Sequence, residues 1–265
     1  MIYKLGKDKF DAVRSLFNQP QLGFVVDAVI AGNSNGDVWV DDSSCPRTAC
    51  LWDRGPRYYM VGRDDNKAFN TELGRVIAEH PTSPYLVAYC ASDAWGSKLS
   101  DVFAGRPFKK RQRCLYKLDR LAIPDWRGNI TQGFSVERID RQLLENEEIA
   151  NLDGLKEEIL CMWHSLDAFL EKAFGFCAIR VENSIACWCT AEYISRGQLG
   201  IGIETVREYQ RQSLATLTAS AFAEHCLSSN MDAHWDSWAD NIPSIRVAEK
   251  VGFRKILDYY VYQGQ

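Results

Sequence analysis

The stretch at residues 198–226, QLGIGIETVREYQRQSLATLTASAFAEHC, constrains the fold of this chain more than any other. In its first part Ile201, Ile203 and Thr205 alternate with Gly202 and Glu204, and a period of two is typical of a strand. After a polar link at 206–210, hydrophobic residues return at helical spacing: Leu214, Leu217, Ala221, Phe222 and Cys226. The pattern predicts a strand that runs through a short loop into an amphipathic helix.

The loop between this strand and this helix, Gln210 to Ala215, is small, polar and positively charged. Backbone N–H groups at the start of a helix lack partners within the helix, and the helix dipole makes that end positive. Such a turn can hold an anion with main-chain atoms alone. The sequence therefore predicts an anion-binding turn that is well suited to a pyrophosphate.

The same loop resembles the acyl-CoA-binding turn of GNAT-type N-acetyltransferases, whose pattern is Q/R-x-x-G-x-G/A. Gln210 fits the first position, Ala215 fits the last, and Ser213 stands where the family has glycine. The segment from Asn241 to Phe253 is similar to a second family motif, N-x-x-[AS]-x-x-x-x-x-x-x-G-F. The pair, in this order and at this spacing, is more specific than either motif alone.

Four shorter matches point to one subfamily. The segments GIGIETV, SLAT, AHWDSWADN and AEKVGF together resemble the zwittermicin A resistance acetyltransferases. The resemblance covers roughly the last 100 residues, which is within the size of one domain. It implies an α/β (α+β) fold of the GNAT type, a mixed and mostly antiparallel sheet flanked by helices.

The resemblance also implies a place for acetyl-CoA, in a V-shaped opening between the strand that ends at Val206 and the strand that ends at Ala239. The backbone N–H groups of 211–215 would hold the pyrophosphate. Asn241 would contact the pantetheine arm or the acyl end; capping the helix that follows it is the structural alternative, and the two roles are compatible. The implied cofactor-binding residues are Thr205, Val206, Gln210, Arg211, Gln212, Ser213, Leu214, Ala215, Asn241 and Ser244.

The two halves of the chain have a similar order of predicted strands and helices, so we expect two GNAT-like halves. The expected ranges are an N-terminal half at 1–123, a linker region at 124–153 and a cofactor-binding domain at 154–265. In the first half, segment 24–30 has the pattern of a strand and 84–90 that of another. A single helix at 155–173 is expected to open the second domain.

Only the second half is expected to hold the cofactor. At the corresponding place in the first half, a strand ends in Gly62-Arg-Asp-Asp-Asn66. Two neighbouring carboxylates at that turn, Asp64 and Asp65, would repel a pyrophosphate.

Acetyl transfer to an amine requires that the nitrogen lose a proton, so the site needs a base or a water relay. Glu204 lies on the strand that leads into the anion-binding turn, where it is a candidate for this base. The alternative is a structural Glu that holds the loop. Many family members carry a further Glu a few residues earlier on this strand, where this chain has Leu199 and Gly200.

Other titratable residues lie on later strands. His234 and Asp236 share a face by alternation and could relay a proton or bind a cationic substrate, although a buried structural pair explains them equally well. Ala248 occupies the position of the family's general-acid Tyr. Tyr259 and Tyr260 are candidates for that acid, set against an ordinary aromatic place in the core.

Composition excludes several functional classes. The formal net charge is −4, with a pI of about 5.7, so neither nucleic acid nor an anionic membrane is expected as a partner. The first residues lack the hydrophobic core of a signal peptide, and nine scattered cysteines fit free thiols in a reducing cytoplasm. Cys187-Trp-Cys189 lacks the spacing of a zinc site, so no metal is expected.

These observations predict a cytoplasmic N-acetyltransferase that moves an acetyl group from acetyl-CoA, its co-substrate, to a primary amine of a small molecule by direct attack. Two other functions stay open: a non-catalytic acyl-CoA-binding or sensor protein, and a scaffold that keeps the fold without the cofactor. An oligomer is compatible with the sequence.

Overall fold

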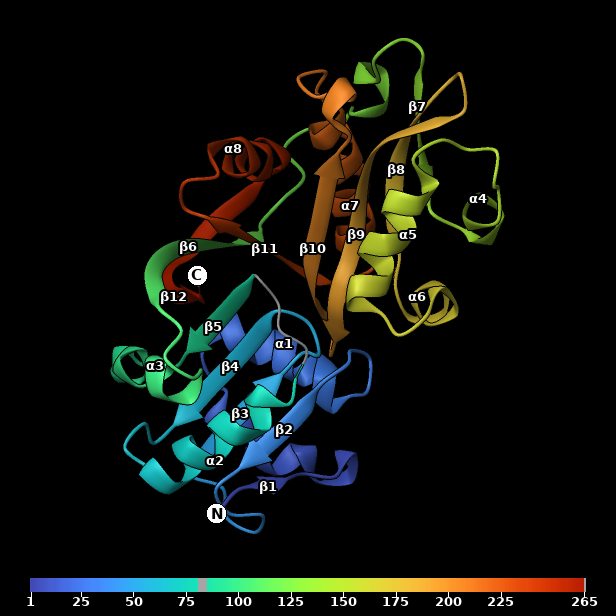
Figure 1. Cartoon of the computed structure of the whole chain (residues 1–265). Helices are drawn as coiled ribbons and strands as arrows, with labels where there is room; N and C mark the ends of the chain where they lie inside the picture. The colour runs from blue at the N-terminus through green and yellow to red at the C-terminus, as the bar shows by residue number, and fades with distance from the viewer. Residues whose placement is uncertain (81–84, 265) are drawn as a thin grey trace. The chain divides into compact units, whose positions relative to one another are not determined.

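The computed structural model describes residues 1–80 and 85–264, and the chain divides into two compact units (Figure 1). Unit 1 contains residues 1–113 and the residues from 259 onward, and unit 2 contains Cys114–Asp258. The chain passes between the units within two long strands, β6 (Phe108–Leu118) and β12 (Phe253–Gly264). The units are thus interleaved in sequence, unlike the contiguous ranges 1–123 and 154–265. No helix among the described residues is long and apolar enough to span a bilayer.

The sheet of unit 1 has the order β1-β2-β3-β4-β5-β12, in which β4 and β5 are parallel and the other pairs are antiparallel. Helix α2 connects the parallel pair, as parallel strands require. Trp95, Phe69 and Leu73 are fully buried against this sheet. The elements are β1 (Tyr3–Lys4), the 3₁₀ segment η1 (Lys7–Leu16), α1 (Pro20–Ile30), β2 (Asp37–Val40), β3 (Thr48–Trp52), β4 (Arg57–Gly62), α2 (Lys67–Ala78), β5 (Leu86–Cys90), η2 (Asp93–Lys98) and α3 (Leu99–Val102).

One predicted strand of unit 1 is wrong. The segment 24–30 belongs to helix α1, which begins with Pro20 at its first position. A short continuous hydrophobic run fits a buried helix as well as a buried strand, and here the side chains are buried on several sides. The predicted strand 84–90 appears as β5 from Leu86, and Pro84 lies outside the described residues.

The sheet of unit 2 has the order β6-β11-β10-β9-β8-β7. It repeats the pattern of unit 1, because antiparallel strands β7 to β10 are followed by a parallel pair, β10 and β11, with α7 between them. The elements are η3 (Arg127–Asn129), β7 (Phe134–Arg138), α4 (Arg141–Leu144), α5 (Leu152–Met162), α6 (Leu166–Lys172), β8 (Gly175–Arg180), β9 (Ser184–Ser195), β10 (Gln198–Thr205), η4 (Arg207–Tyr209), α7 (Leu214–Ser228), β11 (Asp232–Trp238) and α8 (Ile242–Val251).

Helices cover both faces of this sheet (Figure 1). On one face Phe222 of α7 packs with Cys189 and Leu199, and on the other face Ile159 of α5 packs with Trp188. Adjacent residues of β9 thus point to opposite helices, as a strand requires. A mixed, mostly antiparallel sheet with flanking helices is the fold predicted from the sequence.

Two further expectations for unit 2 meet a different arrangement. The single helix expected at 155–173 is two helices, because the backbone is extended at Trp163 and Ser165 caps the second helix by accepting from Ala168 N. The segment 124–153, expected as a linker region, contains η3, β7 and α4, and β7 pairs with β8.

Candidate active site

Strands β10 and β11 separate before they end. They pair in parallel at Gln198/Asp232, Leu199/Ala233 and Gly200/His234. Beyond Gly200 the first strand continues to Thr205, while the second continues past His234. The two strands therefore diverge towards the turn between β10 and α7, at the place where the sequence predicts a V-shaped opening.

A β-bulge lies beside this point of separation. Between the pairs Ser195/Gln198 and Glu192/Gly200, β9 carries one residue more than β10. Tyr193 within the bulge has a φ of 51°, which is unusual for a bulky residue. Bulges are frequent next to functional sites, and here Glu192 is the last residue of β9 in regular register before the bulge.

The turn between β10 and α7 has a continuous run of backbone donors without a hydrogen-bond acceptor among the described residues. Arg211 and Ser213 have φ values of 65° and 64°, and the N–H groups of 211–216 donate no hydrogen bond among the described residues. Ser213 is the N-cap of α7, but its side chain makes no capping hydrogen bond. Left-handed residues alternating with other conformations form a nest that binds anions. Its position at a helix N-terminus strengthens the attraction.

The left-handed conformation explains the sequence of the turn. The φ of 64° at Ser213 lies in the left-handed region that favours glycine. The GNAT motif that this loop resembles has glycine at the same position. Gln210 Nε2 donates to Thr205 O at 3.3 Å, and Thr131 Oγ1 donates to Gln212 O at 3.2 Å. These contacts brace the turn through its carbonyls and leave its N–H groups exposed.

The other predicted cofactor-binding residues near the turn face the protein. Thr205 Oγ1 donates to Cys187 Sγ at 3.3 Å, and Val206 N donates to Ala186 O at 2.9 Å. Leu214 is buried in the core. Their side chains fix the turn, so a ligand would meet mainly the backbone.

Asn241 and Ser244 lie at the start of α8. The side chain of Asn241 accepts from Ser244 N at 3.3 Å, so Asn241 is the N-cap that the alternative interpretation expected. Ser244 Oγ accepts from Trp235 Nε1 at 3.0 Å. Gly252 ends the helix with a φ of 119°, a left-handed conformation that glycine adopts readily.

Three of the predicted catalytic residues lie on the strands that separate. Glu204 lies near the end of β10. Partial desolvation of its carboxyl by the surrounding protein raises its pKa above the usual range. His234 is 7% exposed, and burial, with Lys117 adding to the effect and Asp232 opposing it, lowers its pKa to about 4. His234 is therefore a neutral imidazole at neutral pH. Asp236 lies two residues further along β11.

Tyr260 belongs to β12 in unit 1, where the Lys110 ammonium lies 4.4 Å from the centre of its ring. Tyr259, the other candidate acid, is buried in the same unit and lies beside the ring of Tyr89. The role of either tyrosine as a general acid stays a prediction.

Sequence reasoning missed two carboxylates above Gly202. A Cβ built on Gly202 would lie 2.5 Å from Glu192 Oε1, 2.8 Å from Glu158 Oε1 and 3.0 Å from Thr190 Oγ1. These side chains come from β9 and α5, far from the motifs in sequence. Only the register of β9 against β10 brings them here, although the alternation of glycines at 200 and 202 signals a place without side chains.

A hollow beside the turn is lined by residues from the turn and from the neighbouring strands. Tyr209 and Gln212 come from the turn, Phe134 from β7 and Arg180 from the end of β8. The guanidinium of Arg180 lies 6.0 Å from the ring centre of Tyr209. Glu182 and Glu208 line the same hollow, and Arg180 pairs with Glu182 at 2.6 Å, so the hollow combines an aromatic ring with a paired cation next to the N–H groups of the turn.

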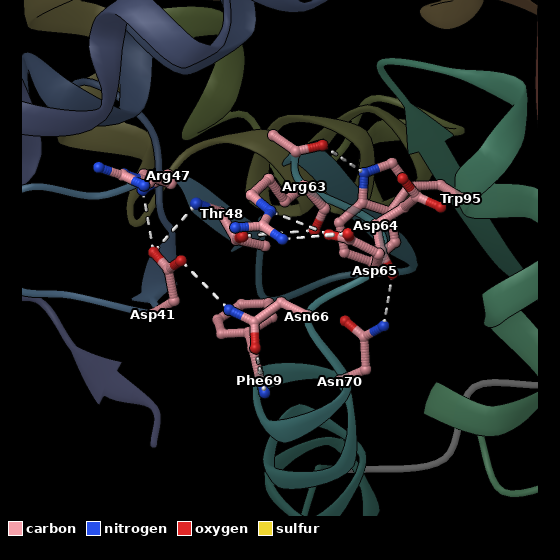
Figure 2. Close-up of polar contacts among 11 residues, drawn as sticks. Asp41, Arg47, Thr48, Arg63, Asp64, Asp65, Asn66, Phe69, Asn70 and Trp95 are labelled. Atoms are coloured by element: carbon pink, nitrogen blue, oxygen red, sulfur yellow. Dashed lines mark hydrogen bonds and ion pairs between the residues drawn. The ribbon is translucent and has the colours of Figure 1, made fainter.

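The corresponding turn of unit 1 is filled by its own side chains (Figure 2). Asn66 caps α2 by accepting from Phe69 N at 3.1 Å, and Asn70 Nδ2 donates to Asp64 O at 2.8 Å. Arg63 pairs with Asp65 at 2.9 Å. The start of α2 therefore has its capping group within the protein, and two carboxylates lie beside it.

Comparisons with known proteins agree with this geometry. A family model described as GNAT acetyltransferase matches residues 14–262. The chain is 22% identical over 263 residues to an uncharacterized N-acetyltransferase, YdfB, of Bacillus subtilis (strain 168), covering 99% of this chain and 98% of that protein.

Solved structures are similar in fold. A GCN5-related N-acetyltransferase-like protein from Streptococcus suis 89/1591 has a TM-score of 0.75 at 19% identity, covering 97% of this chain and 99% of that chain. A tandem GNAT protein from the clavulanic acid biosynthesis pathway has a TM-score of 0.63 at 13% identity, covering 99% and 97%. Because the family model spans both units, the whole chain, and not only its second half, belongs to the GNAT acetyltransferase family.

Proposed function

We propose that this protein transfers an acetyl group from acetyl-CoA to a primary amine of a small molecule, and that unit 2 alone holds the cofactor. The run of N–H groups at 211–216 that donate no hydrogen bond among the described residues, next to the separated strands β10 and β11, is the observation that carries the proposal. These two features match two parts of one ligand. The N–H groups suit a pyrophosphate, and the opening between the strands suits the pantetheine arm.

The residues present fit acetyl-CoA without a metal. The nest formed by Arg211 and Ser213 holds the pyrophosphate, and the exposed backbone of β10 pairs with the amides of the pantetheine arm. The hollow with Arg180 and Tyr209 suits the nucleotide end of the molecule, which carries an aromatic base and a further phosphate. When bound, the cofactor supplies an activated thioester, which the amine attacks directly.

Several finer points belong to the same proposal. The acceptor is an aminopolyol or a similar amine, by similarity to the zwittermicin A resistance subfamily. The reaction takes place in the cytoplasm, in keeping with nine free cysteines. Glu204, His234, Asp236 and Tyr260 remain the catalytic residues predicted from the sequence, and Asn241 and Ser244 remain predicted contacts of the cofactor.

Calorimetric titration of the full chain with acetyl-CoA, followed by a thiol-release assay over a panel of amines, tests the proposal. We expect saturable binding and amine-dependent release of the CoA thiol. Binding without release for every amine would favour a non-catalytic acyl-CoA-binding protein. A failure to bind acetyl-CoA would leave only a scaffold and would remove the proposed function.

A further inference from the structure

A pair of carboxylates meets above the middle of β10. Glu192 Oε1 and Glu158 Oε1 lie 2.5 Å and 2.8 Å from the same point, the place of a Cβ on Gly202. The two oxygens are therefore close neighbours, and they occupy the volume that any side chain at 202 would need. Glycine at this position keeps the backbone of β10 within reach of both groups.

The strand register puts this pair on the face that also carries the predicted catalytic residues. Gly200 pairs with Glu192 on one side and with His234 on the other, so Glu192 and His234 flank a position that has no side chain. Paired residues of neighbouring strands point to the same face. Glu204, an even number of residues from Gly200, points there as well.

Two backbone features single out Glu192. It directly precedes the β-bulge of β9, in which Tyr193 takes a φ of 51°. It also lies opposite Gly200, the last residue of β10 that pairs with β11. A left-handed conformation in a bulky residue costs free energy and is typical of places where a side chain must be held in a particular direction.

Distance along β10 separates Glu192 from Glu204. A strand rises about 3.3 Å per residue, so the stretch from Gly200 to Thr205 spans roughly 16 Å. This span is comparable with an extended pantetheine arm, whose phosphate end lies at the turn after Thr205. The thioester at the other end then lies near Gly200, which pairs with Glu192, and the Glu192 carboxyl reaches from there over Gly202, whereas Glu204 lies two residues closer to the phosphates.

We propose that Glu192 is the catalytic residue that takes the proton from the acceptor amine, and that Glu158 is a positioning residue that holds the incoming ammonium against it. The inference rests on the proposed function and deepens it. It moves the base from β10 to β9, and it predicts an acceptor that arrives as a cation on the face covered by α5.

A carboxylate oxygen of Glu192 takes one proton from the ammonium, which leaves a neutral amine with a free electron pair. This pair forms a C–N bond to the thioester carbonyl carbon, and the C–S bond breaks with its electrons on sulfur. The nitrogen releases a second proton to the thiolate, so the products are an amide and the CoA thiol, and the proton on Glu192 leaves to solvent.

The test compares four variants of the full chain with wild type, namely E192Q, E158Q, E204Q and E145Q. E192Q keeps the shape of the side chain and removes the base, E204Q does the same at the rival position, and E145Q changes an exposed Glu of α4's C-terminus as a matched control. For each we would measure kcat, KM and the pH profile with one good amine, and acetyl-CoA affinity by calorimetry.

We expect E192Q to lower kcat/KM by about 10²–10⁴-fold, the usual loss for a general base, and to remove the acidic limb of the profile. Its acetyl-CoA affinity should match wild type, and E145Q should match wild type throughout. E158Q should raise KM for the amine more than it lowers kcat, which a purely structural role would not do.

Three results would overturn the inference. One is an E192Q variant within about threefold of wild type, far from the loss expected for a base. Another is an E204Q variant that alone loses the acidic limb, which would assign the base to Glu204 as predicted from the sequence. The third is an unchanged KM in E158Q. A wild-type protein that binds acetyl-CoA but acetylates no amine would instead contradict the proposed function.

Discussion

The two parallel strand pairs of this chain have the same topology but a different extent of pairing. In unit 1, β4 and β5 pair from Arg57/Val87 to Met60/Cys90, and Ala91 N still donates to Met60 O. In unit 2, the pairing of β10 and β11 stops at Gly200/His234, well before either strand ends. The same order of elements therefore gives a closed sheet in one unit and an opening in the other.

The turns that follow these strands differ in the same sense. Asn66 caps α2 with its side chain and donates to Asp41 Oδ2 at 3.2 Å (Figure 2). Ser213 at the start of α7 makes no such bond. A helix end that is capped by its own chain has fewer donors for a ligand. The comparison teaches that local contacts, rather than topology, decide which helix begins with a side-chain cap and which begins with unpaired N–H groups.

The largest expected effect comes from blocking the open turn. Phe in place of Ser213 puts a bulky side chain where the pyrophosphate must approach the backbone. Each hydrogen bond to a charged group contributes about 1.5–3 kcal/mol, so losing several should weaken acetyl-CoA binding about a thousand-fold or more. Calorimetry measures this loss directly.

Stability must be measured on the same variant, because a bulky residue is a rarer occupant of the left-handed region than Ser. A folded S213F protein with unchanged acetyl-CoA affinity would show that this turn is not part of the cofactor site.

A pH experiment probes the edge of the opening, where His234 is buried. Its pKa falls from 6.5 to about 4 in the folded protein, so the unfolded chain binds more protons between these values and stability falls as pH falls. Between pH 7.5 and pH 5 this residue should remove about 2 kcal/mol of unfolding free energy. Urea denaturation of wild type and H234Q at both pH values gives the difference, and H164Q at an exposed site controls for the loss of a histidine.

If H234Q and wild type lose the same unfolding free energy on acidification, His234 is not held neutral by burial. The face proposed to receive the amine would then have a different charge at low pH.

The capped turn of unit 1 predicts a smaller effect. N66A removes the cap of α2 and the contact with Asp41, and loss of an N-cap costs about 1 kcal/mol of stability. Acetyl-CoA affinity should stay unchanged, since we expect the cofactor only in unit 2. A loss of affinity in N66A without a loss of stability would show that the first turn takes part in binding.

The smallest effect is expected for S213G. Glycine relieves the left-handed strain of about 1–2 kcal/mol but adds flexibility that costs about 0.5–1 kcal/mol, so a net gain of roughly 0.5 kcal/mol follows. The backbone donors are retained, so acetyl-CoA affinity should match wild type. A tenfold or greater loss of affinity would mean that the Ser213 hydroxyl itself contacts the phosphate.

The sequence by itself determined the family, the mixed sheet and the place of the turn between β10 and α7. These depend on local patterns, namely alternation in β10, helical spacing in α7 and the motif from Gln210 to Ala215. Local patterns were not enough at 24–30, where a hydrophobic run became a helix, or at 155–173, where Trp163 divides one expected helix into two. Burial on several sides removes the periodicity on which such predictions depend.

Only the tertiary structure decided how residues distant in sequence meet. Strands β6 and β12 each run through both units, and β9 pairs with β10 in one particular register. Both features depend on contacts between residues that are distant in sequence. A shift of one residue in that register would send Glu192 to the opposite face, towards α7, and leave Gly202 without its carboxylates. Pairing between strands, which a linear pattern does not encode, is the physical reason why the turn could be predicted from the sequence and the carboxylate pair could not.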